Sequence, residues 1–424
     1  MAVIALVEAY PYATICGGDG VYLERLRHYL LLHGHNVVSI VTDTARGRAN
    51  PMVRLRGAYG AHHRWMLRGS LRLRRGVYLS LLPALVRNAA RRMRGMAAGD
   101  GEPGRGELAW LRRRLDRLRP DAILLGMGAC AFAGDLAKRG IPLVALRGFL
   151  VEVDNGLERE ARLQQDLLSR RYAELAPADL VTFNNKADAA AYSRATGRGA
   201  AIVGMGFPTR SSGRDGADPV LLFVGAATAC NIQSLRWFLD RCWPAIVAVV
   251  PEACFRIIGS VATALATLPN GVVAVGAVDD LGPEYAAAQV VVAPLVSGSN
   301  GVKTKVIEAL SFGRALVTTS LGIEPEDRPH LAGGLLIADD PDHFSALVVR
   351  LLSDASARRQ VEHAAGRLFQ RLYAEGQAYG DLAQFLDARL PQQRSRPVQG
   401  TVRGWRAANV QAERGYKAGV DNIG

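Results

Sequence analysis

The stretch PLVSGSNGVKTKVIEALSFGRALVTTS, which begins at Pro294, combines residue types that could hold a phosphorylated ligand. It has the pattern of a buried strand end, a loop of Gly, Ser and Asn, and a helix that carries Lys303, Lys305 and Glu308. Small loop residues let backbone N–H groups approach phosphate, which the positive end of a helix also attracts. The lysines add ammonium groups there, and the Glu308 carboxylate can accept hydrogen bonds from a pair of hydroxyls. Phosphate beside a sugar diol describes a nucleotide.

A structural role for the same stretch stays open on spacing alone. Short Gly and Lys motifs recur by chance, and a glycine loop can simply reverse the chain before a helix with a solvated Lys/Glu face. The stretch is not a Walker loop, because no G-K-[ST] follows its glycines.

Alternating strand and helix patterns in both halves of the chain indicate two parallel α/β sheets. In the first half, apolar runs such as AVIALVEAY and NVVSIVTD alternate with helical stretches, and the pattern restarts at VLLFVGAATACN. The segment GFPTRSSGRDGADP is the best linker candidate between the halves. We expect two Rossmann-like domains that face each other across a cleft, because ligands of open α/β sheets bind at the carboxyl ends of the strands.

The net charge of +13 is concentrated in one segment. Residues 54–119 contain 17 Arg, no Lys and four acidic residues, which gives +13 from this segment alone. Apolar residues such as Trp65, Leu67 and Leu71 lie between the arginines. An ordinary surface helix can carry such a stripe, but a sustained excess of Arg beside apolar residues is typical of surfaces that bind anionic lipid. We therefore expect peripheral membrane docking by this segment.

Cysteine usage and hydropathy exclude several protein classes. The five cysteines are scattered, with no C-x-x-C pair and no His at ligand spacing, so we expect neither a zinc site nor a disulfide framework. The N-terminus lacks a basic leader, and no run reaches about 18 uncharged apolar residues. We expect a cytoplasmic protein, peripheral at the inner face of the cell membrane.

Several ordered segments resemble one family of enzymes. PLVSGSNGVKTKVIEALSFGRALVTTSLGIEP is similar to the donor-site motif of the family 4 glycosyltransferases, retaining enzymes of the GT-B fold within the glycogen-phosphorylase/glycosyltransferase superfamily. FVGAATACNIQSLRWFLDRCWPAI, FRIIGS and VVAVGAVDDLGPEYAAAQVVVAPL resemble, in the same order, the family's first strand and helix, second strand and nucleotide-base loop. GGDGVYLERLRHYLLLHGHNVVSIVTD resembles its N-terminal phosphate-side loop. The resemblance is to the bacterial members.

The resemblance implies a domain organisation. A Rossmann-like acceptor-binding domain should cover residues 1–207, with the Arg-rich segment 54–119 as an insertion. A Rossmann-like nucleotide-sugar-binding domain should cover 208–368. A C-terminal helix and tail should occupy 369–424 and could cross back to the first domain.

The resemblance also implies the roles of individual residues. Glu308 should bind the donor ribose, and Lys303, with Lys305 as second choice, should hold the diphosphate. Asp19 could contact an acceptor hydroxyl, although Asp is equally suited to cap the following helix. We expect a catalytic set of Lys303, Glu308 and Asp19, and a donor site made of Gly17, Gly18, Gly225, Ala277, Val278, Ser299, Asn300, Gly301, Lys303, Lys305 and Glu308.

Two departures from the family pattern change the expected donor site. Many members carry an acid eight positions before the Glu, but Asn300 stands there in this sequence. The Arg and Lys that often follow the first strand of the second domain are absent from VGAATACNIQSL. More of the phosphate binding should therefore fall on Lys303 and Lys305.

Polar residues after the strands of the first half are candidates for the acceptor side. They follow DAILLG and IPLVAL, where strand-end residues of α/β folds often contact ligands but also cap helices. These candidates are Met127, Gly128, Arg147, Glu152 and Asp154.

The residues and the resemblance together predict a glycosyltransferase. It should move a sugar from a nucleoside diphosphate sugar, UDP-sugar favoured, to a hydroxyl-bearing and possibly lipid-linked acceptor, with retained anomeric configuration. No metal and no cofactor are expected, because lysines and a helix N-terminus can neutralise the leaving diphosphate. The alternatives are a nucleotide-sugar epimerase of GT-B architecture, an Arg-rich nucleic-acid-binding protein, and a catalytically silent sugar-nucleotide-binding subunit. We expect no nucleic acid as partner.

The membrane hypothesis predicts the outcome of liposome co-sedimentation. The protein should sediment with vesicles that contain anionic lipid, and binding should weaken as salt screens the Arg54–Arg119 segment. Equal binding to neutral vesicles, or binding to neither kind, would contradict the hypothesis.

Overall fold

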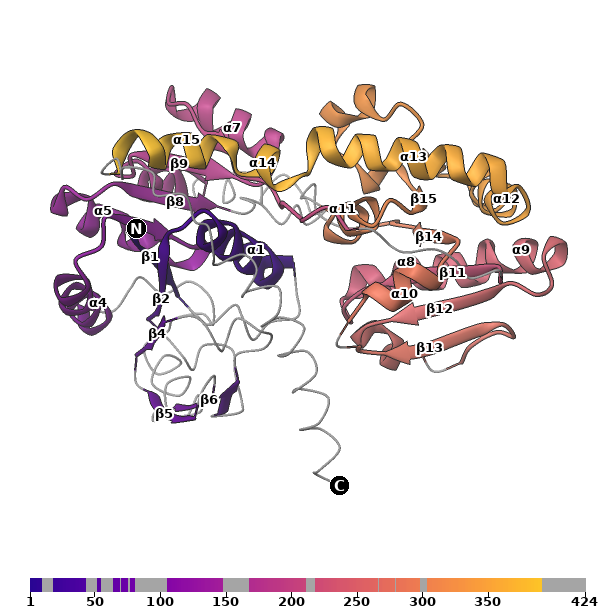
Figure 1. Cartoon of the computed structure of the whole chain (residues 1–424), viewed down its shortest axis with the longest axis horizontal. Coiled ribbons are helices and arrows are strands. Elements are labelled where there is room, and N and C mark those ends of the chain that lie inside the picture. The colour runs from indigo at the N-terminus through magenta and orange to yellow at the C-terminus, as the bar shows by residue number, and fades with distance from the viewer. Residues whose placement is uncertain are drawn as a thin grey trace. The chain divides into compact units, whose positions relative to one another are not determined.

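The computed structural model describes residues 1–9, 18–42, 52–54, 64–68, 70–74, 77–80, 105–147, 168–210, 218–265, 267–278, 280–297 and 303–390 (Figure 1). These residues fall into two compact units. The first consists of the described residues of Met1–Arg147, Leu167–Val181 and Gln384–Gly424. The second consists of those of Gly148–Asp166 and Thr182–Ala383.

A seven-stranded sheet is formed by strands from the first half of the described chain. Its pairs β1–β2, β1–β7, β7–β8, β2–β4 and β9–β10 are all parallel. Strands β1, β2, β7, β8 and β9 are short, mostly buried and mostly apolar, as expected when helices cover both faces of a parallel sheet, while the edge strands β4 and β10 are less buried. Their spatial order is β10 (Ala201–Ile202), β9 (Leu180–Phe183), β8 (Leu143–Arg147), β7 (Ala122–Leu125), β1 (Val3–Glu8), β2 (Asn36–Val41) and β4 (Arg64–Leu67).

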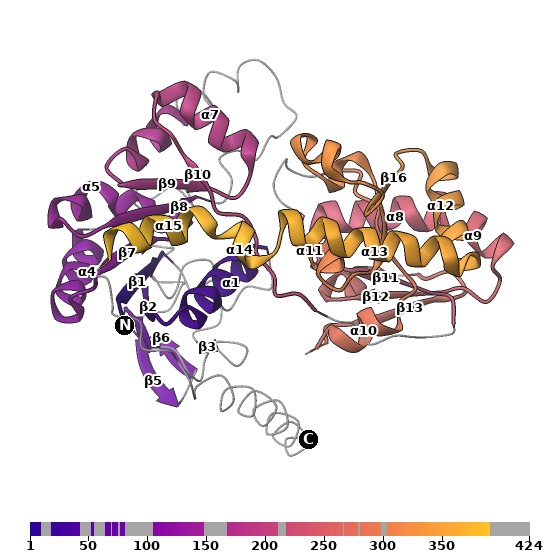
Figure 2. The same ribbon diagram turned by 45° about the horizontal axis from the view of Figure 1, so that its top comes forward.

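Helices connect these strands and cover the sheet (Figure 2). Helix α4 shows how they pack: Leu111 and Leu115 are buried, while most of its arginines stay partly or fully exposed. The helical elements of this part are α1 (Gly18–Leu32), α4 (Arg105–Leu118), α5 (Ala133–Leu136) and α7 (Lys186–Thr196), with 3-10 turns η2 (Met127–Phe132) and η3 (Ala137–Arg139).

A buried ion pair fixes the carboxyl end of β1. The guanidinium of Arg27 on α1 donates to Glu8 at 2.5 Å and to the Ser39 hydroxyl on β2 at 2.9 Å. The same guanidinium lies 4.5 Å from the centroid of the Trp65 ring on β4. Because both charges are fully buried, removal of either partner would leave the other uncompensated, at a cost of about 3–5 kcal/mol.

The Arg-rich segment is partly built into this architecture. Strand β4 extends the seven-stranded sheet, and α4 buries Leu111 and Leu115. Some of its arginines form ion pairs, as Arg68 does with Glu107 at 3.5 Å and Arg112 with Asp135 at 2.7 Å. The other described strands of the segment join a small antiparallel sheet in the order β3 (Met52–Arg54), β6 (Val77–Ser80) and β5 (Ser70–Arg74).

A second, six-stranded sheet lies in the second unit. All its registered pairs are parallel, from β12–β13 to β15–β16. The chain starts at the central strand, winds to one edge and then crosses to the other half of the sheet, as in doubly wound folds. The spatial order is β13 (Val272–Gly276), β12 (Cys254–Ile258), β11 (Val220–Val224), β14 (Val290–Ala293), β15 (Ala315–Thr318) and β16 (Leu336–Ile337).

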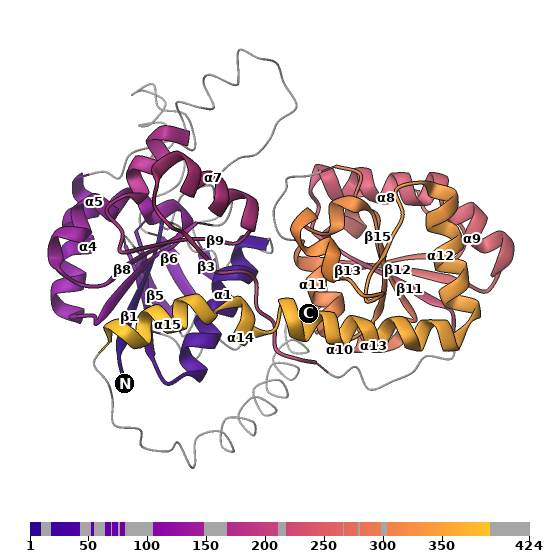
Figure 3. The same ribbon diagram turned by 90° about the horizontal axis from the view of Figure 1, so that it is seen from above.

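Reversal of the winding direction places helices on both faces of this sheet, because parallel crossovers are right-handed. Figure 3 shows α8 and α13 on opposite sides of the strands. The core on the first face packs Phe238 against Phe255 and Phe344, with ring centroids 4.9 and 5.9 Å away. This face carries α8 (Ala229–Arg241), α9 (Trp243–Val249) and α12 (Pro341–Ser353); the other carries α10 (Gly282–Ala287), α11 (Thr304–Ser311) and α13 (Ala355–Leu372).

The segment after β10 runs beside the end of α13 and the short helix α14 (Glu375–Ala378), which α15 (Gly380–Arg389) follows. The amide of Gly204 donates to the carbonyl of Ala378 at 3.1 Å. The Tyr379 hydroxyl accepts from the amide of Gly206 at 3.2 Å. A side chain at position 206 would lie 2.7 Å from the Tyr379 ring, so this close approach requires glycine.

The architecture confirms the expected α/β fold with two parallel sheets. Among the described residues, no helix is both long enough and apolar enough to cross a membrane.

The contact between the loops that follow β11 and β12 leads to a stability prediction. Gly259 has φ +101°, and a Cβ there would lie 2.2 Å from the carbonyl oxygen of Gly225. Gly276 has a similar φ of +86°, but a Cβ there meets nothing within 4 Å. Gly259→Ala should lower the free energy of unfolding by about 3 kcal/mol or more, and Gly276→Ala by only about 1–2 kcal/mol. Denaturant unfolding of both variants measures this difference; equal losses would contradict the role of the close contact.

Candidate functional site

Helix α11 begins where the predicted phosphate loop ends. Lys303 precedes its first turn, and Val306, Ile307, Ala309 and Leu310 are buried. These apolar residues hold the helix against β14, β15 and α13, so its three charged side chains have fixed surroundings. Lys303, Lys305 and Glu308 leave the helix in different directions, each toward a different set of partners.

The ammonium group of Lys305 is held between an amide and an aromatic ring. It donates a hydrogen bond to Oδ1 of Asn231 on α8 and lies 4.5 Å from the centroid of the Phe223 ring. Burial and, to a smaller extent, the charge of Lys303 together lower the pKa of Lys305 to about 7. An anion placed nearby would favour the charged form, so this lysine can respond to a bound phosphate.

The carboxylate of Glu308 is paired with an arginine that precedes the second sheet in the sequence. Nη1 of Arg210 lies 3.4 Å from Oε1 of Glu308, whose side chain is 13% exposed. The guanidinium also lies 4.7 Å from the centroid of the Phe312 ring, which stacks on Tyr285 at 4.3 Å. Burial, and then the charge of Glu308, raise the pKa of the Tyr285 hydroxyl. Arg210 therefore balances the Glu308 charge in a mostly apolar setting.

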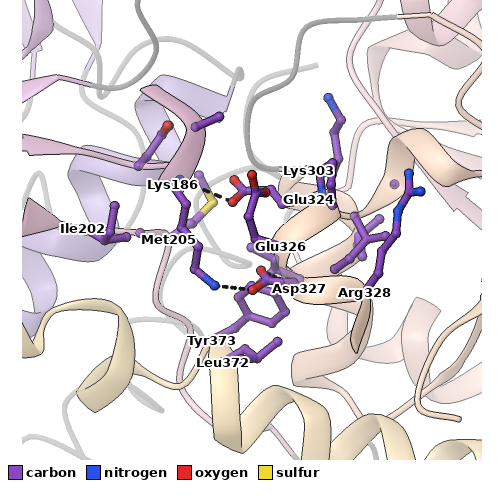
Figure 4. Close-up of a pocket in the computed structure, with 18 of the residues that line it drawn as sticks. Lys186, Ile202, Met205, Lys303, Glu324, Glu326, Asp327, Arg328, Leu372 and Tyr373 are labelled. Atoms are coloured by element: carbon purple, nitrogen blue, oxygen red, sulfur yellow. Dashed lines mark hydrogen bonds and ion pairs between the residues drawn. The ribbon is translucent and has the colours of Figure 1, made fainter. Parts of the chain in front are cut away.

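Lys303 lies at the edge of a pocket of about 240 Å³ (Figure 4). The pocket lies entirely in the second unit. Val306 and Ile307 line it one turn below Lys303, as the helical spacing of three to four residues requires. Ile202, Met205 and Leu372 add apolar wall, and polar groups come from Lys186, Ser320, Glu324, Asp327 and Tyr373. Burial lowers the pKa of Lys303.

The two carboxyl oxygens of Glu324 differ in their hydrogen bonding. Oε2 accepts a hydrogen bond from the backbone amide of Lys186 at 3.4 Å. Within the described part of the chain, Oε1 is buried and has no hydrogen-bond partner. Burial raises the pKa of Glu324 to about 7, because the charged form loses hydration. Figure 4 shows this carboxyl between Lys186 and Lys303.

The neighbouring acid, Asp327, is fully engaged by contrast. It forms an ion pair with the ammonium of Lys186 and accepts a hydrogen bond from the Tyr373 hydroxyl at 3.1 Å. Burial, and then the charge of Asp327, raise the pKa of Tyr373. These three side chains form a hydrogen-bonded network. It lies beside Oε1 of Glu324, which has no hydrogen-bond partner among the described residues.

The loop after β11 forms a second wall near the lysines. The amide of Gly225 donates to the carbonyl of Ile258 at 2.9 Å. Nδ2 of Asn231 donates to the carbonyl of Ala226 at 2.8 Å while Oδ1 accepts from Lys305. Asn231 therefore links this loop to α11.

The remaining predicted residues have the following places. Ala277, which is exposed, and the half-buried Val278 follow β13. In the first unit, Gly18 and Asp19 begin α1, Met127 and Gly128 begin η2, and Arg147 ends β8. The predicted residues Gly17, Ser299, Asn300, Gly301, Glu152 and Asp154 lie outside the described residues.

Sequence patterns did not single out Arg210, Lys186 or Glu324. Arg210 lies in the predicted linker, where composition indicated only flexibility. Lys186 follows β9 as the first residue of α7, and strand-end position was its only signal. Glu324 lies in the LGIEP segment of the motif, but its burial and its contact with Lys186 depend on the fold.

No group of three or more His, Cys, Asp and Glu side chains that could hold a metal ion occurs among the residues described.

The second sheet matches a known family model. Residues 218–354, which span β11 to α12, match the model described as Glycosyl transferases group 1. The resemblance found in the motifs is confirmed at this level, while family 4 and retention stay predictions. A search of curated proteins finds no match.

Solved structures match nearly the whole chain at low identity. Sucrose-phosphate synthase from Thermosynechococcus elongatus is 16% identical with a TM-score of 0.61, over 92% of this chain and 100% of that one. HepE of Anabaena, in complex with UDP and glucose, is 13% identical with a TM-score of 0.59 over the same shares. α,α-Trehalose 6-phosphate synthase from Burkholderia multivorans is 13% identical with a TM-score of 0.55, over 94% and 100%. The fold is that of GT-B glycosyltransferases.

The raised pKa of Glu324 predicts a pH-dependent effect of its removal. The unfolded chain releases this proton near pH 4.5 and the folded protein near pH 7. As pH rises between these values, the buried carboxyl group therefore lowers the free energy of unfolding by an increasing amount. Lys186 lowers this cost, and Asp327 and Glu326 increase it. Glu324→Gln should therefore raise the melting temperature relative to wild type by a few degrees more at pH 8 than at pH 5.

The exposed Glu252 supplies the control for this experiment. Glu252→Gln should shift the melting temperature by the same small amount at both pH values. If Glu324→Gln behaves like this control, the carboxyl is solvated and not buried as described.

Proposed function

We propose that this chain, whose residues 218–354 carry the glycosyl transferases group 1 match, transfers a sugar from a nucleoside diphosphate sugar to a hydroxyl-bearing acceptor. The observation that carries the proposal is the arrangement of Lys303, Lys305 and Glu308 on α11, at the carboxyl edge of a parallel sheet. HepE, which has the same fold, is described in complex with UDP-glucose, and this supports a UDP-sugar as the donor here.

The order of strands supports a linear donor along the sheet edge. The loop after β13 carries Ala277 and Val278, and the loop after β14 leads to Lys303. Three strand spacings separate these loops in the order β13-β12-β11-β14, or roughly 14 Å. We place the base at Ala277 and Val278, the ribose at Glu308 and the diphosphate at Lys303 and the start of α11.

Charge explains how these residues would promote transfer. Breaking the bond between sugar and phosphate leaves negative charge on the diphosphate, and Lys303 and Lys305 stand where they can neutralise it. Both lysines are partly desolvated by burial, so their attraction to the leaving group is stronger than it would be in water. Lysines that supply this charge make a metal ion unnecessary in the proposed mechanism. Retention of anomeric configuration is the stereochemistry that the family 4 resemblance implies.

Arg210 would keep Glu308 ready to bind the ribose diol. Its guanidinium lies 3.4 Å from one carboxylate oxygen and holds the side chain in place. A carboxylate held in this way loses little further side-chain entropy when it accepts hydrogen bonds from two hydroxyls.

The acceptor side of the proposal rests on the first unit and on the Arg-rich segment. We assign acceptor binding to the residues that follow β7 and β8, with Asp19 at the start of α1. The net charge of +13 between Arg54 and Arg119 supports an anionic membrane as neighbour and a lipid-linked hydroxyl compound as acceptor. The proposed location is the cytoplasm, at the inner face of the membrane.

Two substitutions on α11 test the proposed function. Glu308→Ala should weaken UDP binding about tenfold or more, because the ribose diol loses its charged acceptor. Lys303→Ala should mainly lower kcat for donor turnover, because its interaction grows as charge develops on the leaving group. Calorimetric titration with UDP and donor hydrolysis measure the two effects.

Glu252→Ala, on the surface of the same domain, is the matched control and should leave both values unchanged. Folded Glu308 and Lys303 variants that equal wild type in UDP affinity and donor turnover would remove the main support of the proposal.

A further inference from the structure

We infer that the pocket beside Lys303 receives the sugar ring of the donor, and that Glu324 binds one of its hydroxyl groups. The inference rests on the proposed function and extends it to a part of the ligand that is not assigned to Lys303, Lys305 or Glu308. It assigns a specificity-determining role to a residue that sequence patterns did not single out.

The first argument comes from the order of loops at the sheet edge. The loop that leads to Lys303 follows β14, and the pocket residues Ser320 to Glu324 follow the adjacent strand β15. A donor whose base lies after β13 and whose diphosphate lies at Lys303 therefore continues toward the loop after β15. The group attached beyond the diphosphate is the sugar.

The second argument is that the two loops are joined rigidly. The hydroxyl of Thr318 donates to the carbonyl of Ala293 at 2.6 Å, and that of Thr319 donates to the carbonyl of Leu295. A Cβ at Gly322 would lie 2.1 Å from the Thr318 hydroxyl oxygen, so only glycine fits this turn. The segment that leads to Glu324 is thus tied to residues 293–295 at the end of β14, and such support keeps a ligand-binding group in position.

The third argument is the hydrogen-bonding state of the pocket. Asp327, Lys186 and Tyr373 satisfy one another. Oε1 of Glu324 is buried and has no partner within the described residues, and such a group costs free energy until it receives a hydrogen bond. A sugar hydroxyl can donate that bond, while the Lys186 amide holds the other oxygen in place.

The size and lining of the pocket fit a single ring better than a larger group. Its volume of about 240 Å³ is below the range of about 300–1,000 Å³ that accommodates drug-sized ligands. Ile202, Val306 and Ile307 offer apolar surface for the C–H face of a sugar, and Glu324 and Ser320 offer polar groups for its edge.

The test compares the affinity of UDP with that of UDP-sugars in wild type and variants. The probes are UDP, UDP-glucose, UDP-galactose and UDP-N-acetylglucosamine, titrated into the full chain. In Glu324→Ala, the dissociation constant of each UDP-sugar that wild type binds should rise about tenfold, while that of UDP stays within twofold. Glu252→Ala changes an exposed acid that does not line the pocket and should leave all constants near those of wild type.

The ratio of the dissociation constants for UDP and for each UDP-sugar separates the possible outcomes. A parallel loss for UDP and UDP-sugars would mean that Glu324 only supports the fold, and unchanged constants would mean that no hydroxyl reaches it; either result overturns the inference. Glu324→Gln, which keeps the shape of the side chain, should give the same selective loss to a smaller degree. If wild type binds none of the four probes, the proposed function itself fails, and the inference fails with it.

Discussion

The charged side chains of α11 in largely apolar surroundings are the feature on which the candidate site depends. Val306, Ile307, Ala309 and Leu310 anchor the helix in the second domain, so its charges cannot turn freely into solvent. Lys305 donates a hydrogen bond to Asn231 and contacts the face of the Phe223 ring, and Glu308 forms an ion pair with Arg210. Burial lowers the pKa of both lysines, because it disfavours their charged forms, and a bound anion would favour those forms again.

This arrangement gives the three charged side chains three different sets of neighbours. Glu308 faces the aromatic pair Tyr285 and Phe312, Lys305 faces the loop after β11, and Lys303 borders the pocket after β15. In the proposed donor position, the base and ribose would lie toward the β13 side of this edge, the diphosphate at the start of α11, and the sugar toward the loop after β15. Preorganised charge of this kind stabilises a leaving diphosphate without reorganisation at the moment of reaction.

The fold and the charged residues of α11 could be predicted from the sequence, because short apolar runs mark buried parallel strands and small residues mark the loops after them. The partners of those residues could not. Arg210 reaches Glu308 across 98 residues, and the Lys186 amide reaches Glu324 across 138. Composition identified residues 54–119 by their charge, but it gave no sign that Arg64–Leu67 would pair with β2 as a strand of the main sheet. Long-range pairing depends on the fold and leaves no local pattern.

The most direct measurement is a calorimetric titration of the wild-type protein with UDP and, separately, with uridine. If α11 holds a nucleoside diphosphate, UDP should bind at one site at least tenfold more tightly than uridine, because only the diphosphate reaches the lysines and the helix N-terminus. Equal affinity for the two, or no binding of UDP at millimolar concentration, would contradict the account.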